Sequence, residues 1–401
     1  MNLTKAVSKI GHSFIKKYDN ELCMLVESLK KKDDQTQYIV YMIFNIPEEI
    51  IEFKIVNELQ EDSVYKYNYL GTNKGRSAQI YLTREVSKVN YLFNNVFNDL
   101  FYKLKENDMQ DGQLAELINK LDGLDMIRIG EKLGEGSINP TRLSIFKNED
   151  LTLKISANSL EINHDSLSFK DLLNKILDNT NKNNIFELIV PVIINEDYKE
   201  IILSGHHDYI ELVKKENKLQ TNSKSKNKKV CHVCLKEKNN VSSNYTKKFM
   251  RKGINKIFTT TTKNTSQLEN GFSYDRVYSI CMSCFQDLLA GEKVIFEDFQ
   301  CNIANERVFV LPIGYIRNFE YDHLQKIKHN VDLAFHTETR KNWLANLENE
   351  ADKIVNNNYS LNFLFYRTDG NSISILTTIE DVPTLQFQKV IDELEKESYN
   401  Y

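Results

Sequence analysis

The sequence predicts an α+β protein of several domains, with mixed sheets, packed helices and an inserted four-cysteine module. Three observations lead to this prediction. The chain has 401 residues, enough for two or three domains, and 41% hydrophobic content with 10% aromatics is sufficient for packed cores. Segments with helical and strand-like periodicity alternate irregularly along the chain. Two Cys-x-x-Cys pairs, Cys231 with Cys234 and Cys281 with Cys284, enclose a single loop.

Before residue 220, apolar spacing and β-branched content predict an alternation of helices and strands. Strands are expected where β-branched and aromatic residues gather, at residues 38–44, 51–56, 143–155 and 185–193, with strand-like character also over 64–82. Helices are expected where apolar residues recur at the helical period, at residues 3–29, 89–104, 109–125 and 166–177. Ser166 is the expected cap of the last helix.

Residues 221–229 contain no apolar side chain and form the clearest linker in the chain. We therefore divide the chain into an N-terminal α+β domain (1–220), an inserted module (221–300) and the C-terminal part of the α+β body (301–401). The C-terminal part is expected to hold a strand at 308–316, edge-like or bulged at Pro312, a helix pair over 320–355, a hairpin of 361–366 and 373–379, and a final helix at 385–394.

The two cysteine pairs predict one metal site. A Cys-x-x-Cys turn lets two sulfurs reach one ion, and four thiolates form a tetrahedral donor set for Zn²⁺. Because 46 residues between the pairs close one loop, we predict a structural Zn²⁺ in a zinc-ribbon-like module, bound by Cys231, Cys234, Cys281 and Cys284. The alternatives are two disulfides or a redox dithiol. A helix from Phe285 is expected to end at Gly291, and the two isolated cysteines, Cys23 and Cys301, are expected to be buried thiols.

The net charge of −4 conceals an uneven distribution. Residues 224–263 hold 12 Lys or Arg against the single acid Glu237, a local +11 that leaves −15 for the rest of the chain. Such a concentration either holds phosphate groups or is a solubilising loop. Interleaved aromatic residues, such as Phe249 and Phe258, either stack on bases or form the module's small core. The candidate nucleic-acid-binding residues of the module are Lys228, Lys229, Lys247, Lys248, Arg251, Lys252 and Lys256.

A second basic element is the turn that spans residues 71–76. It carries Asn73, Lys74 and Arg76, which we add to the candidate nucleic-acid-binding residues because a turn can bring them to a phosphate or a base edge. The alternative is a plain surface hairpin turn.

Two segments imitate enzyme motifs. Residues 130–137 are glycine-rich like the phosphate loop of a protein kinase, but the chain contains neither His-Arg-Asp nor Asp-Phe-Gly. The triplet His206-His207-Asp208 contains the His-Asp pair of a metal phosphohydrolase, a site that needs further His and Asp ligands. We find no paired carboxylates and no nucleophile with a base, so we expect no catalytic activity. A metal phosphohydrolase is kept as the third functional alternative.

The sequence also predicts where the protein resides. No window approaches the ~18 consecutive apolar residues of a membrane span, and residues 1–5 lack a signal-peptide pattern. We expect a cytoplasmic protein without a membrane partner. The reducing conditions there favour thiolate ligands over disulfides.

Several motifs follow one another in a characteristic order between Val230 and Pro383. They are the two Cys-x-x-Cys pairs, Phe258-Thr259-Thr260-Thr261, Gly271-Phe272, Leu289-Ala290-Gly291, and the segments 362–367 and 379–383. In this order and spacing, the chain resembles the large subunit of the type I-B CRISPR surveillance complex, Cascade.

The resemblance implies a subunit of an RNA-guided complex that has no chemistry of its own. Its implied partners are the guide RNA-backbone subunits, target DNA, in which it reads the protospacer-adjacent motif, and a helicase-nuclease that it recruits. Large subunits usually continue into a C-terminal helical domain, whereas this chain stops about one helix after Pro383. Either a separate small subunit supplies that bundle, or this is a shortened homologue that docks into the complex and inhibits interference, an anti-CRISPR role.

Overall fold

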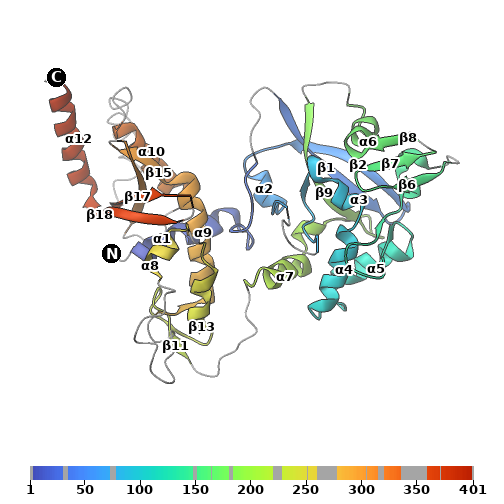
Figure 1. Ribbon diagram of the computed structural model, residues 1–401, viewed down its shortest axis with the longest axis horizontal. Helices are drawn as coiled ribbons and strands as arrows, with labels where there is room; N and C mark the ends of the chain where they lie inside the picture. The colour runs from blue at the N-terminus through green and yellow to red at the C-terminus, as the bar shows by residue number, and fades with distance from the viewer. Residues whose placement is uncertain are drawn as a thin grey trace. The chain divides into compact units, whose positions relative to one another are not determined.

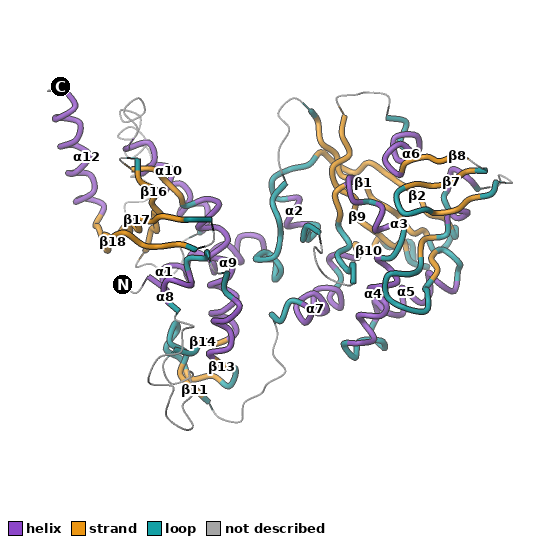
Figure 2. The backbone as a smooth tube through the Cα atoms, viewed as in Figure 1, coloured by secondary structure: helices purple, strands orange, loops and turns teal. Residues whose placement is uncertain are grey.

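The computed structural model describes residues 3–29, 35–72, 78–147, 151–163, 165–179, 184–219, 228–250, 252–259, 278–303, 305–314, 320–335, 359–370 and 372–399. Over these residues the chain is a mixed α+β protein with several sheets, as predicted (Figures 1 and 2). It divides into two compact units, unit 1 with residues 1–19 and 220–401, and unit 2 with residues 20–219. The three-part division made from the sequence groups the chain differently and stays a prediction. No helix of the described part is long and apolar enough to cross a membrane.

Unit 2 is built on a five-stranded sheet. β1 (Thr36–Asn45) and β9 (Asn184–Ile194) run parallel to each other, and β2 (Ile50–Glu58), β10 (Glu200–Ile202) and β3 (Arg84–Glu85) add antiparallel. The middles of β1 and β9 are buried without interruption, as expected for strands covered on both faces. The predicted strands at 38–44, 51–56 and 185–193 are confirmed.

Short helices and two small sheets complete unit 2. The α-helices are α2 (Ser63–Lys66), α3 (Asn90–Phe93), α4 (Val96–Glu106), α5 (Gln113–Gly123), α6 (Phe169–Ile176) and α7 (His207–Glu216). The small sheets pair β4 (Ile127–Arg128) with β5 (Ser137–Ile138), and β6 (Leu153–Ile155) with β7 (Ser159–Ile162) and β8 (Asp165–Ser168). The 3-10 turns of unit 2 are η1 (Val86–Lys88), η2 (Pro140–Arg142), η3 (Ser144–Phe146) and η4 (Leu203–Gly205).

Five local predictions before residue 220 were wrong. The helix expected at 3–29 ends at Tyr18, because Asp19 takes a left-handed conformation (φ +45°), and residues 19–29 form turns and irregular chain. The described part of 64–82 contains no strand. Its apolar side chains are buried in the core, but the backbone follows an irregular path and has no neighbouring strand to pair with. Only Leu153–Ile155 forms a strand within 143–155, and the helix expected at 89–104 is split into α3 and α4. Ser166 lies in β8, and the cap of α6 is Ser168, whose hydroxyl accepts a hydrogen bond of 3.1 Å from the Asp171 amide.

Unit 1 contains an antiparallel sheet in the order β15-β16-β17-β18. Its strands are β15 (Gln300–Ile303), β16 (Glu306–Gly314), β17 (Tyr359–Thr368) and β18 (Ile373–Pro383). The predicted hairpin is confirmed, with Gly370 at φ +87° in its turn. Pro312 lies beyond the residues of β16 that pair with β15, so its missing N–H costs no ladder hydrogen bond on that side.

Two helices pack on this sheet. α10 (Tyr321–Phe335) contributes Ile327 and Val331 to the core, and α12 (Thr384–Tyr399) contributes Phe387 and Ile391. The final helix was predicted over 385–394 and is confirmed. The second helix expected after α10, and the break near Thr337, lie outside the described residues.

The first and ninth helices, α1 (Leu3–Tyr18) and α9 (Met282–Asp298), lie side by side in unit 1 (Figure 1). Their backbones meet at two glycines. A Cβ on Gly11 would lie 1.8 Å from the Asp287 carbonyl oxygen, and a Cβ on Gly291 would lie 2.2 Å from the Val7 carbonyl oxygen. The prediction that the helix ends at Gly291 was therefore wrong. Gly291 is a contact point between helices, and α9 continues to Asp298.

Candidate metal centre

The first cysteine pair lies in a short hairpin. β11 (Lys229–Val230) pairs antiparallel with β12 (Glu237–Lys238), and Cys231 and Cys234 occupy the turn between them. The Cys231 amide donates to the Lys236 carbonyl at 3.0 Å, and the Leu235 amide donates to the Cys231 carbonyl at 2.8 Å. These bonds fold the turn tightly enough to bring both sulfurs to one side.

The second cysteine pair begins a helix. β13 (Val241–Ser242) pairs with β14 (Ile280–Cys281), and Cys281 is the N-cap residue of α9. Cys284 follows in the first turn of that helix. A helix N-terminus carries positive partial charge, so this position favours thiolates over thiols.

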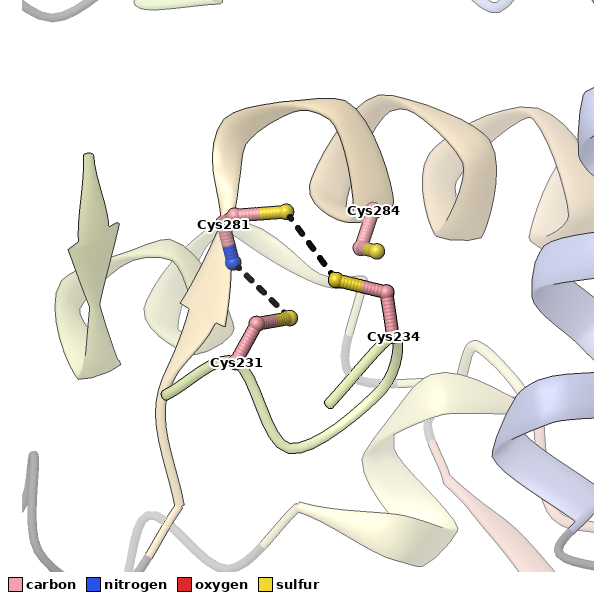
Figure 3. Close-up of side chains that lie close together, drawn as sticks. All are labelled: Cys231, Cys234, Cys281 and Cys284. Carbon is pink, nitrogen blue, oxygen red and sulfur yellow. Dashed lines mark hydrogen bonds between the residues drawn. The ribbon is translucent and has the colours of Figure 1, made fainter. Parts of the chain in front are cut away.

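The structure brings all four cysteines together (Figure 3). Their sulfur atoms lie within 4.8 Å of one another, and the Cys234 and Cys281 sulfurs are 4.0 Å apart. Four sulfurs at about 2.3 Å from a tetrahedral ion would be about 3.8 Å apart, so the arrangement fits a metal ion. The Cys281 amide donates to the Cys231 sulfur at 3.3 Å, a contact that stabilises a thiolate. All six cysteines of the chain are free of disulfides, and the isolated Cys23 and Cys301 are buried as predicted.

A histidine holds the two cysteine pairs against each other. The His232 amide donates to the Ser279 carbonyl at 2.9 Å, and the Ser279 amide donates to Nδ1 of His232 at 2.9 Å. His232 stands between the ligands of one pair, and Ser279 stands two residues before the other. This double contact fixes the separation of the pairs without using the imidazole as a ligand.

Without a bound ion, the four cysteines share negative charge unequally. Hydrogen bonds from the Cys231 and Cys284 thiols lower the pKa of Cys281, and contacts within the same group raise the pKa values of Cys284 and Cys231. Burial lowers the pKa of Lys238, but the nearby Cys281 thiolate raises it, and the net direction is upward. Lys238 also donates to the Ser283 hydroxyl at 2.9 Å, which lies 3.2 Å from the Cys281 sulfur. Lys238 therefore offsets part of the cluster's negative charge.

Aromatic residues form the core of the module, which decides between the two sequence alternatives for Phe249. Tyr245, in the 3-10 segment η5 (Ser243–Lys248), stacks on Phe285 of α9 with ring centroids 5.1 Å apart. Phe249 lies 5.7 Å from the same ring. Both Tyr245 and Phe249 are buried, so neither ring is open to a base. The side chain of Phe258, the last residue of α8 (Asn255–Phe258), lies outside the described residues.

A buried carboxylate that was not predicted from the sequence ties the module to α9. Glu292 is 1% exposed and accepts backbone hydrogen bonds from Met250 at 3.2 Å and Asn255 at 3.1 Å. A Cβ on Gly253 would lie 2.1 Å from its Oε2 atom, so the chain wraps closely around this group. Burial raises the pKa of Glu292 to about 7, against these hydrogen bonds, which lower it. The signal that could have identified it is an acid placed, with Lys293 beside it, inside the otherwise apolar segment 288–296.

The raised pKa predicts that Glu292 makes unit 1 less stable as the pH rises. The folded state keeps a proton on Glu292 that the unfolded chain loses near its ordinary pKa. Its contribution is therefore complete below about pH 4.5 and is lost as the pH rises through about 7, a change of at most about 3 kcal/mol. Urea unfolding at pH 5, 6, 7 and 8 measures it. The pH slope should become shallower in Glu292→Gln and stay unchanged in the exposed control Glu116→Gln; equal slopes in all three proteins would contradict the prediction.

The predicted nucleic-acid-binding residues fall into three groups. Lys228 and Lys229 adjoin the first cysteine pair, and Lys247 and Lys252 are exposed beside η5 and α8. Lys248 lies over the Tyr245 and Phe285 rings, and Lys256 donates to the Thr246 carbonyl at 3.0 Å, so both take part in the module's own packing. Four predicted residues lie outside the described part of the chain: Arg251, Asn73, Lys74 and Arg76.

The glycine-rich segment is used within unit 2. The Gly130 amide donates to the Asn98 side chain at 2.9 Å, and the Gly134 amide donates to the buried Asp99 carboxylate at 2.7 Å. These amides, which would have to face phosphate in a kinase-like loop, therefore point into the protein.

The His206-His207-Asp208 triplet also has local structural contacts. Nδ1 of His206 accepts from the Asp208 amide at 3.2 Å and caps α7, while Asp208 accepts from the Leu114 amide at the start of α5 at 2.9 Å. Among the described residues, the four-cysteine cluster is the group of three or more metal-ligand side chains that the geometry brings together.

Comparison with known proteins finds a family similarity in unit 1. No curated protein and no solved structure matches the chain. Residues 228–382 match the family model described as the central domain of the CRISPR-associated protein TM1802 (cas_TM1802). The matched segment contains all four clustered cysteines, α9 and the four-stranded sheet of unit 1. The match covers 155 of the 401 residues, and this segment is similar to the central domain of a CRISPR-associated protein.

Proposed function

We propose that this chain is the non-catalytic large subunit of an RNA-guided type I-B CRISPR surveillance complex, in which it contributes to recognition of the protospacer-adjacent motif, to target DNA binding and to helicase-nuclease recruitment. The observation that supports the proposal most is the family match over residues 228–382. It covers almost the same stretch as the motif order that resembles this subunit. The family description carries the CRISPR association, and the specific role is our inference.

The metal in this proposal is a structural Zn²⁺. Four cysteine sulfurs within 4.8 Å of one another select zinc or an iron–sulfur centre, and a mononuclear site of four thiolates leaves no position for substrate. The bound ion would supply cross-linking of the hairpin to the start of α9. The residues of the module would then supply the binding surface, and no step of chemistry is assigned to the site.

Positive charge supports a role for the module in binding nucleic acid. Lys247 and Lys252 are exposed, and residues 224–263 carry a local charge of +11 in a chain whose total is −4. Cations so concentrated attract phosphate independently of base sequence and release counterions on binding. The buried Tyr245 and Phe249 rings favour phosphate contacts over base stacking in this part of the module. Lys228, Lys229, Lys74 and Arg76 stay further candidates.

The test is DNA binding by a complex assembled with and without this chain. With the chain added, binding of target DNA should increase and show a steep dependence on salt. The quadruple variant Lys247→Ala, Lys248→Ala, Arg251→Ala and Lys252→Ala should flatten the plot of log K against log salt by about 0.9 for each phosphate that the variant no longer neutralises, so by roughly 2 to 4. The change should be similar for matched and unmatched DNA, because phosphate contacts carry no base specificity.

The matched control replaces four exposed lysines of unit 2, Lys154, Lys170, Lys175 and Lys199, by Ala. An unchanged slope in the module variant, or an equal change in the control, would reject the assignment of these lysines. The proposed function itself is tested by what the added chain does to the rest of the complex. If the added chain displaces the complex's own large subunit and binding falls, the chain is the inhibitory homologue.

A further inference from the structure

Exposed apolar side chains gather at two places in unit 1 that carry opposite charge. Large apolar residues are normally buried, so exposed pairs are informative where they coincide with charge. Val230 and Leu235 are exposed on the β11–β12 hairpin, and Val390 and Leu394 are exposed on α12. The first pair lies among lysines and the second among acids. Neither pair belongs to the metal site or to the proposed phosphate contacts of η5 and α8.

The first surface is the knuckle face, made of Lys228, Val230, Leu235 and Lys236. Val230 is 47% exposed and Leu235 is 73% exposed. Leu235 also has φ +60°, a conformation that is costly for a bulky side chain. The contact that closes the turn uses only the Leu235 amide, so any residue could make it. The leucine side chain therefore adds nothing visible to the hairpin's own stability.

Charge on the knuckle face is positive after the metal site is counted. Residues 228–240 contain four lysines and one acid, Glu237. Lys238 is engaged with Ser283 beside the thiolates and offsets their charge. Lys228 and Lys236 are exposed and stand next to the apolar pair in the sequence, while the exposed Glu237 lies opposite Val230 in the hairpin.

The second surface is the α12 face, made of Val390, Glu393, Leu394 and Glu397. Val390 and Leu394, 47% and 42% exposed, are four residues apart and so lie on one side of the helix. Phe387 and Ile391 anchor another side of α12 in the core of the sheet, which holds the helix in place. α12 carries four acids and two lysines; Glu393 and Glu397 are both exposed, and Glu393 forms a 2.7 Å ion pair with Lys396 at the surface.

We propose that the knuckle face of one copy binds the α12 face of a second copy. Each face offers two aliphatic side chains, and the net charges of the two segments are opposite in sign: residues 228–240 hold four lysines and one acid, whereas α12 holds four acids and two lysines. Nucleic acid is a less suitable partner for these two faces, because aliphatic side chains do not stack on bases and the acids of α12 repel phosphate. Since the two faces differ, the contact is head-to-tail and leaves one free face of each kind on every dimer.

The arrangement predicts open-ended association of the purified, metal-loaded protein. Sedimentation equilibrium should show an average mass that rises steadily over about two decades of protein concentration. Raising the salt from about 0.05 to 0.5 M should weaken association, because the Debye length falls from about 14 to about 4 Å. Leu235→Ser and Leu394→Ser should each weaken association about tenfold. Leu376→Ser, at an exposed leucine of β18 outside both faces, should leave it unchanged.

Charge reversal distinguishes this contact from any other. Variant A carries Lys228→Glu and Lys236→Glu, and variant B carries Glu393→Lys and Glu397→Lys. Each alone should stay monomeric because its two faces now repel, whereas an equimolar mixture should associate, since A and B present complementary faces in both directions. Circular dichroism and metal content check that both variants are folded.

Three outcomes overturn the proposal. They are a wild-type mass that stays monomeric at every concentration, a mixture of A and B that fails to associate, and association that Leu376→Ser weakens as much as Leu235→Ser. Loss of DNA binding in variant A without change in self-association would assign the knuckle face to nucleic acid instead. Because none of these measurements uses guide RNA or other subunits, their failure leaves the proposed function in the surveillance complex untouched.

Discussion

Replacement of Cys284 by Ser is expected to release the metal ion and to unfold the module around it. Cys284 is buried in the first turn of α9, and its sulfur is one of four that lie within 4.8 Å of one another. Structural zinc contributes about 10–16 kcal/mol of apparent binding free energy in zinc-finger peptides, as much as the whole stability of a typical domain. The β11–β12 and β13–β14 pairs are each two residues long, which is too short to be stable without the metal ion.

Elemental analysis and hydrogen exchange measure this effect. The wild type should hold one equivalent of zinc, and the amides of Leu235 and Cys281, both hydrogen-bonded at the site, should be protected. Both signals should disappear in Cys284→Ser and in wild type treated with a strong chelator. The control is Cys301→Ala, at a buried cysteine outside the cluster, which should keep its metal. A Cys284→Ser protein that keeps a full equivalent of metal and the same protection would show that these cysteines are not the ligands.

Substitution of Gly11 by Ala is expected to separate α1 from α9. The added Cβ would lie 1.8 Å from the Asp287 carbonyl oxygen, a backbone atom that no side-chain movement can relieve. Overpacking of this kind costs about 1–3 kcal/mol and occasionally more. We expect the upper end of that range, because a second backbone atom, the Gly291 nitrogen, would lie 2.5 Å from the same Cβ.

Chemical denaturation with hydrogen exchange tests this prediction. Gly11→Ala should lower the free energy of unfolding of unit 1 and expose the amides of α1, while unit 2 is unaffected. The control is Gly123→Ala at the end of α5, where an added Cβ meets nothing within 4 Å and helix propensity favours Ala by about 0.5–1 kcal/mol. If Gly11→Ala is as stable as wild type, the close crossing of the two helices is wrong.

The metal site and the crossing of α1 with α9 are linked by a series of contacts along α9. The metal site holds the beginning of α9, Glu292 holds the module's loop against the middle of that helix, and Gly291 admits α1 beside it. Helix α1 comes from the first 19 residues, yet it belongs to the same compact unit as the metal site. Removal of α1 should therefore weaken the module even though no residue of α1 is near the cysteines in sequence.

Local patterns in the sequence predicted the elements whose own residues decide them. β1, β2, β9 and the β17–β18 hairpin follow from β-branched runs and an Asp-Gly turn, and α12 follows from helical periodicity. Cysteine spacing predicted the four-sulfur cluster because each Cys-x-x-Cys turn supplies two ligands locally, and two such turns can bind one ion even when they are far apart in the sequence. Prediction failed over 64–82, where the apolar residues have no partner strand. It also failed at the cap of α6, which is Ser168 and not Ser166, two residues earlier.

The sequence alone predicted that four cysteines meet, that positive charge is concentrated in residues 224–263 between and beside them, and that the motif order resembles that of a CRISPR large subunit. Only the tertiary structure decided that Gly291 continues a helix, that Glu292 is buried against the module, and that Leu235 and Leu394 are exposed. The physical reason is the range of the interactions. Ligand spacing and charge are properties of neighbouring residues, whereas a helix crossing, a buried carboxylate or an exposed leucine depends on residues far away in the chain that pack there or leave it open.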